Sequence, residues 1–378
     1  MKTIKFQQET AQDPFYQYVR QQVQVYLKAQ HLSGYATPLV WGKALLYSGL
    51  YLALYLSLLF VKLSFENSLF IWALLGVLGI LIGLNIAHDA AHDALSANKR
   101  LNKWIYRLSF SALGANAYLW QLRHVQSHHL FPNVDDCDAD IDDNPIIRLS
   151  PHKPLYWYHR WQFLYAPVAY LFYTLIWIFV KDWIILKKKR LANLRDIRHP
   201  KAEIWRFFAA KIAYCFYLIA LPVYCMDVAP WQVLIGFVLM HFVQSYAFIF
   251  SLIPSHFSME PVFSKVDAHG YLAQSWARHQ VAASLDYHET RHWANFIFGG
   301  FNAHVAHHLF PQISHVHYPA ISVMIQKATS KFNIPYHHSS LPAAIISHFR
   351  LLKALGKLPP DASALNALPA GTSPSNTT

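Results

Sequence analysis

Residues 67–92 read NSLFIWALLGVLGILIGLNIAHDAAH. The first 21 of them carry no charged side chain, and about 20 apolar residues are enough for a helix to cross the hydrocarbon core of a bilayer. His88 and His92 follow directly, four residues apart. On a helix they share one face and both reach one metal ion at the membrane boundary. Taken alone, such a pair is more often solvated at a helix end. Other histidines in the chain are needed to indicate a metal site.

The composition indicates a membrane protein. Of the 378 residues 54% are hydrophobic and only 14% are charged, which is unusually apolar for a soluble or a disordered chain. The net charge of +12 favours anionic lipid headgroups or acidic partners. Lys187–Arg190 is the single polybasic run, so we expect no nucleic acid partner. The three cysteines lack the spacing of a disulfide framework, and MKTIKFQQET lacks the apolar core of a signal peptide.

Four apolar stretches are expected to cross the membrane as two helical hairpins. A fifth, residues 161–180, is expected to be interfacial or re-entrant, because a crossing there would place the basic run that follows it outside. With four crossings, both termini are cytoplasmic in a multi-pass protein, of the inner membrane if the cell is bacterial. The expected spans are residues 44–61, 67–87, 207–226 and 231–253.

The rest of the chain is expected to form an N-terminal region, a cytoplasmic-side cap and a tail. Residues 1–43 contain an amphipathic surface helix, Phe15–Leu32, with Arg20 and Lys28 on its wet side. The membrane domain is assigned to residues 44–357. Residues 358–378, rich in Pro, Ser, Ala and Thr, are expected to be disordered.

Two further histidine clusters have a similar spacing to the first. HVQSHH contributes three rings from one segment, and neighbouring rings that point about 100° apart on a helix can serve two metal ions. HVAHH has the same kind of spacing, and all three clusters lie on one side of the membrane under the four-span topology. One more histidine, just past Pro254, emerges at the same depth. The candidate metal ligands are His88, His92, His124, His128, His129, His256, His304, His307 and His308.

The surroundings of these histidines have competing interpretations. Four nearby polar residues are candidates for orienting the rings, namely Asn85, Asp89, Asp93 and Asn302. The acidic stretch 135–143 lacks the glycine and terminal glutamate of a calcium loop, so we interpret it as a solvated loop that caps a helix. His241 lies about 22 Å along its helix from the boundary and is assigned a structural or polar contact.

Eight or nine neutral imidazoles without an obligatory carboxylate suit a late first-row metal. Two iron ions also supply chemistry, because together they can reduce dioxygen and remove hydrogen from an unactivated carbon. We therefore expect a di-iron centre with dioxygen as co-substrate and no catalytic residue beyond the metal centre. A site at the membrane boundary suits an acyl chain that enters from lipid.

The chain resembles the membrane fatty acid desaturases, and specifically the linoleoyl-CoA desaturase-like branch. The likeness extends from about residue 86 to residue 336. It is carried by HDAAH, by WQLRHVQSHHLFPN with the acidic stretch after it, by YHRWQFLYAPVAYLFYTLIWIFVKD, and by FGGFNAHVAHHLFPQISHVHYPAI. The resemblance implies an all-α integral membrane protein with four transmembrane helices in two hairpins and a cytoplasmic-side helical cap that holds a di-iron site. By motif position it also implies the ligand role for the nine histidines above.

Two departures from the branch limit what the resemblance implies. Front-end desaturases commonly have glutamine where His304 stands, so the position of the double bond is open. The haem-binding HPGG of a fused cytochrome b5 domain is absent, since His199 and Pro200 are followed by lysine. Electrons are then expected from a separate ferredoxin or cytochrome b5, which the basic surface suits.

The leading hypothesis is an oxygen-dependent fatty acyl desaturase that introduces a cis double bond into an acyl-CoA or acyl-lipid chain. A di-iron hydroxylase or ketolase acting on a lipid or carotenoid has the same ligands and differs only after the first hydrogen is removed. A histidine-rich metal transporter is a rival of another class. Transport needs ligands along the crossing, whereas most clustered histidines here lie at or beyond the ends of spans.

Overall fold

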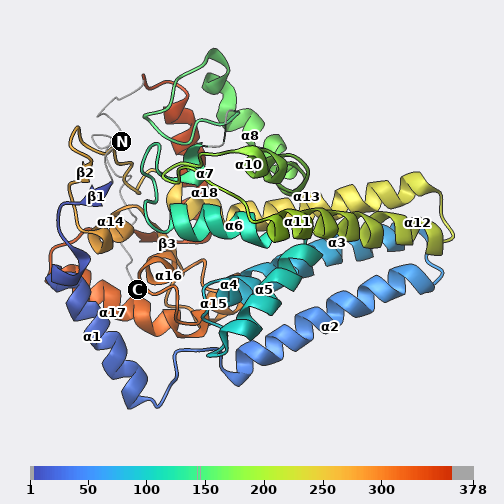
Figure 1. Cartoon of the computed structure of the whole chain (residues 1–378), viewed down its shortest axis with the longest axis horizontal. Coiled ribbons are helices and arrows are strands. Elements are labelled where there is room, and N and C mark those ends of the chain that lie inside the picture. The colour runs from blue at the N-terminus through green and yellow to red at the C-terminus, as the bar shows by residue number, and fades with distance from the viewer. Residues whose placement is uncertain (1–3, 143, 145, 360–378) are drawn as a thin grey trace.

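Four helical segments that are long and apolar enough to cross a membrane project side by side from a helical cap (Figure 1). The computed structural model describes residues 4–142, 144 and 146–359. The four segments are Pro38–Phe60, Phe65–Ala91, Lys201–Cys225 and Pro230–His256. Each of the four expected spans therefore has a helical counterpart.

Two of these segments are continuous helices and two contain a π-helical turn. Proline in the first turn starts both continuous helices, where its missing N–H group has no helical partner to lose. Ser64 begins the second segment by accepting a hydrogen bond from the Asn67 backbone. The elements are α2 (Pro38–Phe60), α3 (Phe65–Ile82), π turn η2 (Gly83–Ala87), α4 (His88–Ala91), α11 (Lys201–Cys215), π turn η6 (Phe216–Ala220), α12 (Leu221–Cys225) and α13 (Pro230–His256).

The first span begins earlier than the charge pattern predicts. The expected start at residue 44 avoids Lys43, yet α2 begins at Pro38 and runs through it. Lys43 is buried, and its ammonium donates to the Asn85 side chain at 2.6 Å and to the Phe296 carbonyl at 3.0 Å. These partners take the place of water, so the lysine does not end the helix.

The fifth apolar stretch forms two limbs bent by 70°. The bend lies deep among the spans, where Thr174 hydrogen-bonds His241 of α13 at 2.9 Å. At the far end of the second limb, Trp183 packs on Phe207 near the start of α11. A helix pair bent in this way is either a broken span or a re-entrant segment. The limbs consist of the 3₁₀ turn η4 (Trp157–Trp161), α8 (Gln162–Leu171), α9 (Tyr173–Ile176), π turn η5 (Trp177–Lys181) and α10 (Asp182–Lys187).

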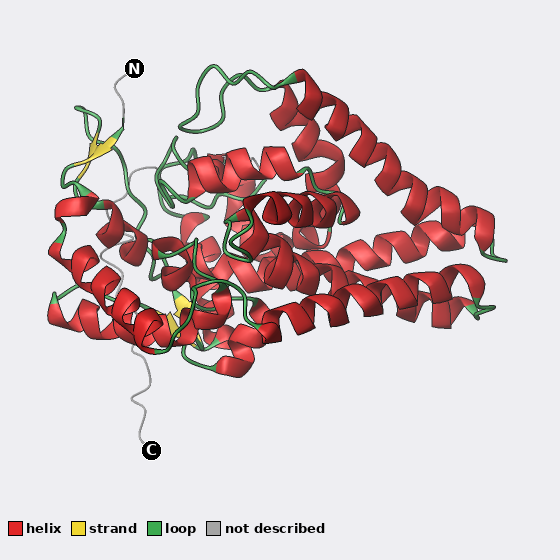
Figure 2. Cartoon of the chain, turned by 60° about the horizontal axis from the view of Figure 1, so that its bottom comes forward, coloured by secondary structure: helices red, strands yellow, loops and turns green. Residues whose placement is uncertain are grey.

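The cap consists of short helices and two small parallel strand pairs (Figure 2). Its helices are α1 (Pro14–Ala29), α5 (Lys99–Ala112), α6 (Ala117–Arg123), π turn η3 (His124–His128), α7 (Ala139–Asp142), α14 (Trp276–Ala282), α15 (His292–Phe298), α16 (His304–Leu309), α17 (Tyr318–Lys331) and α18 (Leu341–Leu355), with 3₁₀ turns η1 (Thr10–Gln12) and η7 (His315–His317). The strand pairs are β1 (Lys5–Phe6) with β2 (Tyr271–Leu272) and β3 (Asp286–Tyr287) with β4 (His338–Ser339).

The amphipathic N-terminal helix is present, but the chain itself covers its apolar face. Phe15, Val19 and Val23 are buried in a cluster formed with α14, α16 and α17. This helix is therefore part of the cap rather than a membrane-surface helix. Of the tail expected to be disordered, residues 360–378 lie outside the described residues.

A buried ion pair ties the re-entrant segment to the third span. Lys211 of α11 donates to Asp182 at 2.7 Å and to the backbone carbonyls of Gly114 and Ile178, each at 2.7 Å. Asp182 also accepts hydrogen bonds from the Asn116 backbone and from the Trp177 ring nitrogen. The ion pair thus joins three segments at one point: α11, the second limb of the bent stretch, and the loop between α5 and α6.

We expect Lys211→Met to destabilise the protein by about 3 kcal/mol or more, because Asp182 loses its charge partner while remaining buried. Thermal unfolding of purified protein measures the loss, and Lys211→Met with Asp182→Asn should recover part of it. The matched control is Lys62→Met, since Lys62 pairs with Asp227 at 3.6 Å on the fully exposed hairpin tips. Equal unfolding temperatures for the two lysine variants would contradict the structural role of the buried pair.

Candidate metal centre

Nine buried histidines from four segments meet where the spans enter the cap. All nine candidate ligands of the sequence analysis are in this set. Eight of them form two groups of four, and in each group one ring nitrogen per residue lies within 4.8 Å of the others. The groups are His88, His92, His124 and His307, and His128, His256, His304 and His308.

In the first group, ring nitrogens face one another without hydrogen-bond partners. The Nε2 atoms of His88, His92 and His307 are buried and have no partner among the described residues. Leaving a buried polar atom unpaired costs about 1–3 kcal/mol. A bound cation removes that cost by coordinating all three nitrogens, so these residues fit a metal ion.

In the second group, backbone and side-chain acceptors fix which nitrogen carries the proton. Nδ1 of His256 donates to the Ala283 carbonyl at 2.8 Å, and Nδ1 of His308 donates to Oε1 of Gln280 at 2.8 Å. Each Nε2 is then a lone pair, yet the two Nε2 atoms lie 3.1 Å apart. Two lone pairs at this distance repel unless a cation lies between them. The second group therefore fits a metal ion as well.

His129 lies between the two groups. Its ring centroid is 4.6 Å from that of His307 in the first group and 4.5 Å from that of His308 in the second. Its Nε2 lies 3.0 Å from Nε2 of His124. His129 is therefore placed to contribute to either ion.

A π-helical turn distributes the second histidine cluster between the groups. The His129 backbone N–H donates to the His124 carbonyl five residues earlier, and the two rings meet edge to face at a centroid distance of 4.5 Å. His128 then points to the other group. The i,i+4 spacing of an α-helix predicts that His124 and His128 serve one ion. They fall in different groups instead, although their rings still stack at a centroid distance of 5.5 Å.

The third cluster is held against the first by a glycine. Gly299 has a left-handed φ of 59°, and a Cβ atom there would lie 2.4 Å from the Leu84 carbonyl of η2. Only glycine allows this approach of the two backbones. The FGG segment thus positions α16 beside the residues that precede His88.

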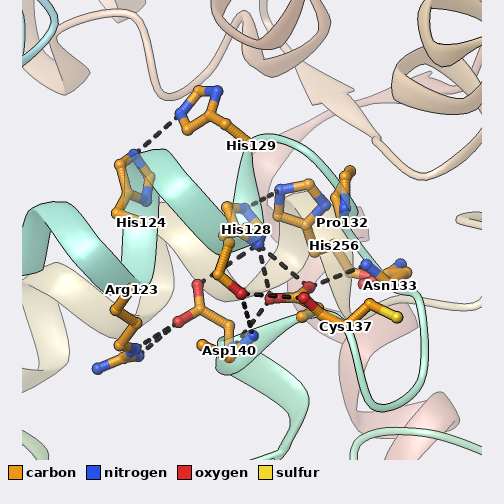
Figure 3. Close-up of polar contacts among 12 residues, drawn as sticks. Arg123, His124, His128, His129, Pro132, Asn133, Cys137, Asp140 and His256 are labelled. Atoms are coloured by element: carbon orange, nitrogen blue, oxygen red, sulfur yellow. Dashed lines mark hydrogen bonds and ion pairs between the residues drawn. The ribbon is translucent and has the colours of Figure 1, made fainter. Parts of the chain in front are cut away.

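The acidic loop after the second cluster is part of the centre, which corrects its interpretation as a solvated loop (Figure 3). Asp138 is fully buried, and both of its oxygens accept from Nδ1 of His128 at 3.1 Å. Its carboxylate also accepts from the Asn133 backbone at 2.9 Å, and the Asn133 side chain donates to the His256 carbonyl. A carboxylate behind a ligating histidine orients the ring and raises its basicity.

A second carboxylate in this loop, Asp140, is neutralised by an arginine. Arg123 donates to it at 2.7 Å and lowers its pKa against the opposing effect of burial. Asp140 also lies 3.6 Å from Nδ1 of His128 and could complete a third cluster with His124 and His128. The short contact with Arg123 favours a role in holding the loop.

The four polar residues expected to orient the rings have other partners. Asn85 binds Lys43, Asp89 accepts from His315 and Ser314, the exposed Asp93 accepts from Asn102, and Asn302 donates to the His288 carbonyl. In the described part of the chain none of the four hydrogen-bonds a ring of the centre. The side chains outside the nine histidines that do are those of Asp138, Gln280 and Tyr318, whose hydroxyl lies 3.5 Å from Nδ1 of His307.

Outside the centre, His241 has the polar contacts expected of it. It hydrogen-bonds Thr174 at 2.9 Å and Tyr214 at 2.8 Å. Of the remaining buried histidines, His279 donates to the Pro132 carbonyl and His315 to Asp89.

Burial keeps most of the imidazoles in the neutral form that metals bind. It lowers the pKa of His92 to about 4. Burial together with neighbouring imidazoles lowers the pKa values of four more histidines well below the usual value, namely His129, His304, His307 and His308. His128 differs: burial lowers its pKa, but the carboxylates of Asp138 and Asp140 outweigh that effect and raise it.

An apolar cavity of about 300 Å³ reaches both histidine groups. His124 of the first group and His256 of the second line it, together with aliphatic and aromatic side chains of the re-entrant segment and α13. Arg123, Asp140 and Lys181 also line it and supply polar groups. A smaller cavity of about 60 Å³ next to His88 shares four aromatic lining residues with it, namely Trp120, Trp177, Phe248 and Phe301.

Comparison with known proteins agrees with this geometry. Residues 66–340 match the model of the family described as fatty acid desaturase. The chain belongs to the fatty acid desaturase family. This desaturase is thus an integral membrane protein and an oxidoreductase of lipid metabolism, and the expected all-α fold class is confirmed.

Curated relatives of the desaturase cover most of its length. It is 29% identical over 347 residues to an acyl-lipid (8-3)-desaturase of Physcomitrium patens, which covers 91% of this chain and 72% of the relative. It is 26% identical over 264 residues to an sn-1 linoleoyl-lipid 6-desaturase of Synechocystis sp., covering 69% and 73%. A chloroplastic acyl-lipid (7-3)-desaturase of Chlamydomonas reinhardtii is 29% identical, covering 76% and 56%.

We expect Asp138→Asn to lower metal affinity about 10- to 100-fold, because the amide cannot supply the negative charge behind His128. Metal content after dialysis against a graded series of chelator concentrations measures the change. Asp136→Asn is the control, since Asp136 lies two residues away and its side chain is 71% exposed. Equal metal retention in both variants would exclude a role for Asp138 in the centre.

Proposed function

We propose that this protein is an oxygen-dependent acyl-lipid desaturase that introduces a cis double bond into a membrane-embedded acyl chain. The observation that carries the proposal is the apolar cavity that touches both histidine groups. The names of the curated relatives, which act on acyl lipids, support a glycerolipid-bound chain over an acyl-CoA.

The proposed cofactor is a pair of iron ions, one in each group of four histidines, with His129 between them. Iron supplies the reduction of dioxygen and the removal of hydrogen from an unactivated methylene. In the balanced reaction, dioxygen accepts two hydrogen atoms from neighbouring methylenes and two electrons with two protons from a donor. One carbon–carbon double bond and two water molecules result.

The chain's own residues position the substrate and exclude water. Ile249, Leu252 and Ile253 of α13 form one wall of the cavity, so an alkyl chain there is packed against fixed side chains. Moving the acyl chain by a single methylene would present a different carbon to the metal centre. The depth of the cavity therefore determines the position of the double bond in the product. Arg123 and Lys181 at the polar part of the lining suit the ester or headgroup end.

The proposed orientation has both termini in the cytoplasm, in the inner membrane if the cell is bacterial. The basic run at the end of α10 then lies on the cytoplasmic side with the cap. Electrons are proposed to come from a separate ferredoxin or cytochrome b5, whose acidic surface suits these cations. The domain division at residues 43 and 357 and the re-entrant assignment of residues 161–180 belong to the same proposal.

The rival functions differ in what they require of the centre. A hydroxylase or ketolase would use the same histidines and leave an oxygen atom in the product. A transporter needs ligands along the crossing, but the nine histidines lie together at the cap end of the spans. The enzyme is therefore favoured over the transporter.

Expression in a host that lacks polyunsaturated lipids, together with an electron donor, should yield a new double bond detectable by gas chromatography with mass spectrometry. Purified protein should contain about two irons per chain. His128→Ala and His307→Ala, one from each group, should each abolish the product while the protein remains in the membrane. Activity retained in either variant would remove that residue from the ligand set. An ¹⁸O atom from labelled dioxygen in the product would select the hydroxylase.

Replacing Phe248 tests the role of the cavity. Its ring lines both cavities and packs against Tyr173 and Trp177 at centroid distances of 5.5 and 5.7 Å. We expect Phe248→Ala to join the cavities and raise the preference for longer acyl chains by on the order of tenfold, since one methylene in an apolar pocket is worth about 1–3 kcal/mol.

Competition between fed fatty acids of increasing length measures this preference. Phe248→Leu is the conservative control, because it keeps most of the apolar volume. An unchanged chain-length profile in Phe248→Ala, with normal thermal stability, would contradict the assignment of the cavity to the acyl chain.

A further inference from the structure

A second hollow lies away from the metal centre, between the 3₁₀ turn η4 that precedes α8 and the C-terminal end of α18. It is a surface groove of about 680 Å³. Seven of its nine lining residues are aromatic or cationic, and the other two are a leucine and a glycine. They are Leu155, Tyr156, Trp157, Arg160, Trp161, Phe163, Lys353, Gly356 and Lys357.

The three cations of the groove have no acidic partner. Within residues 4–142, 144 and 146–359, Arg160, Lys353 and Lys357 form no ion pair, and none of the described lining residues is acidic. All three side chains are exposed. The Lys353 ammonium lies 5.5 Å from the centroid of the Phe163 ring, a cation–π contact that keeps it over the groove.

The two sides of the groove are held together rigidly. A Cβ atom at Gly356 would lie 2.4 Å from the His159 carbonyl and 3.1 Å from Cα of Arg160, so the end of α18 rests directly on the backbone of η4. The cations from both sides therefore surround one fixed space. Such an arrangement suits a compact anion with several oxygen atoms.

The groove lies at the depth of the bilayer surface. Below it α8 descends along α13, since the Tyr246 hydroxyl donates to the Pro167 carbonyl and the Phe172 ring packs on Phe242 at 5.0 Å. The outward face of α8 is apolar and exposed, with Leu164 at 60% and Val168 at 59%. Above these two residues are Trp157 and Trp161.

The two tryptophans mark the boundary between lipid and water. Trp157 is 81% exposed and Trp161 is 54% exposed, and tryptophan is enriched at the level of the headgroups. The groove therefore lies next to the exposed apolar face of α8. A lipid whose phosphate binds in the groove can lay its two acyl chains along that face.

We propose that this groove binds the phosphate headgroup of an anionic membrane lipid, such as phosphatidylglycerol, with its acyl chains along the Leu164 and Val168 face of α8. The site is separate from the substrate cavity, and its residues take no part in the proposed reaction. Charge complementarity with three cations and continuity with the lipid-facing stripe select an anionic lipid over a neutral one.

Native mass spectrometry of the full-length protein in mixed micelles tests the proposal. Phosphatidylglycerol should remain bound in preference to phosphatidylcholine. Replacing all three cations, in Arg160→Gln with Lys353→Gln and Lys357→Gln, should weaken phosphatidylglycerol binding by on the order of 100-fold, about fivefold for each cation. Excess inorganic phosphate should not displace the lipid, because phosphate lacks the acyl chains.

The matched control removes three exposed charges elsewhere, in Lys5→Gln with Lys28→Gln and Lys327→Gln. This variant should bind phosphatidylglycerol as the wild type does. Equal phosphatidylglycerol binding by the groove variant and the wild type would overturn the proposal. The groove would then be free for another occupant, such as an acidic protein. Equal loss in both triple variants would also overturn it, since the effect would then come from net charge alone. If inorganic phosphate displaced the phosphatidylglycerol, the groove would bind a phosphate group alone, and the proposed contact between the acyl chains and α8 would be wrong.

Discussion

The main constraint on the structure is that buried imidazole lone pairs repel one another unless a cation binds them. Among the described residues they have no hydrogen-bond donor. Acceptors behind His256 and His308 hold a proton on Nδ1 of each, and this leaves their Nε2 atoms facing each other at 3.1 Å. Three further Nε2 atoms in the first group are buried without a partner among the described residues. Only cations satisfy so many acceptors at once, so the binding free energy of the metal ions is part of the stability of the cap. The cap and the ends of four spans are organised around this requirement.

Much of this could be predicted from the sequence, because the relevant signals are local. Runs of apolar residues determined the four spans, and the spacing of three histidine clusters indicated a shared site. His256 was identified from its depth alone, since a helix rises a fixed distance per residue. Span boundaries were less certain, because charge was taken to end a helix. Lys43 shows why that fails at the first span: it lies inside α2 and finds its partners on other segments.

The residues that orient the rings could not be found by proximity in sequence. Asp89 lies beside His88 in the chain, yet it points away and accepts from His315. Asp138 is ten residues beyond His128 in a loop that a charge pattern assigns to solvent, but the chain turns back and buries it against that ring. Gln280 carries no signal at all, since one glutamine in a short helix is indistinguishable from any other polar residue. Such contacts depend on tertiary folding, and a π turn in place of an α turn is enough to exchange the partners of His124.

The same tertiary packing links the metal centre to the membrane through the re-entrant segment. One limb, α8, contributes Tyr170 to the wall of the apolar cavity, while Leu164 and Val168 on its outer face are exposed. The other limb contributes Lys181 to the cavity lining, and Asp182 at its side anchors it to Lys211 in the third span. In the proposed re-entrant arrangement, an acyl chain that enters between these limbs would leave the bilayer without crossing water, which would account for the 70° bend. A straight fifth span would fill this path with a packed helix and carry the basic run at its end to the far side of the membrane. On this proposal the bend serves substrate access and topology together.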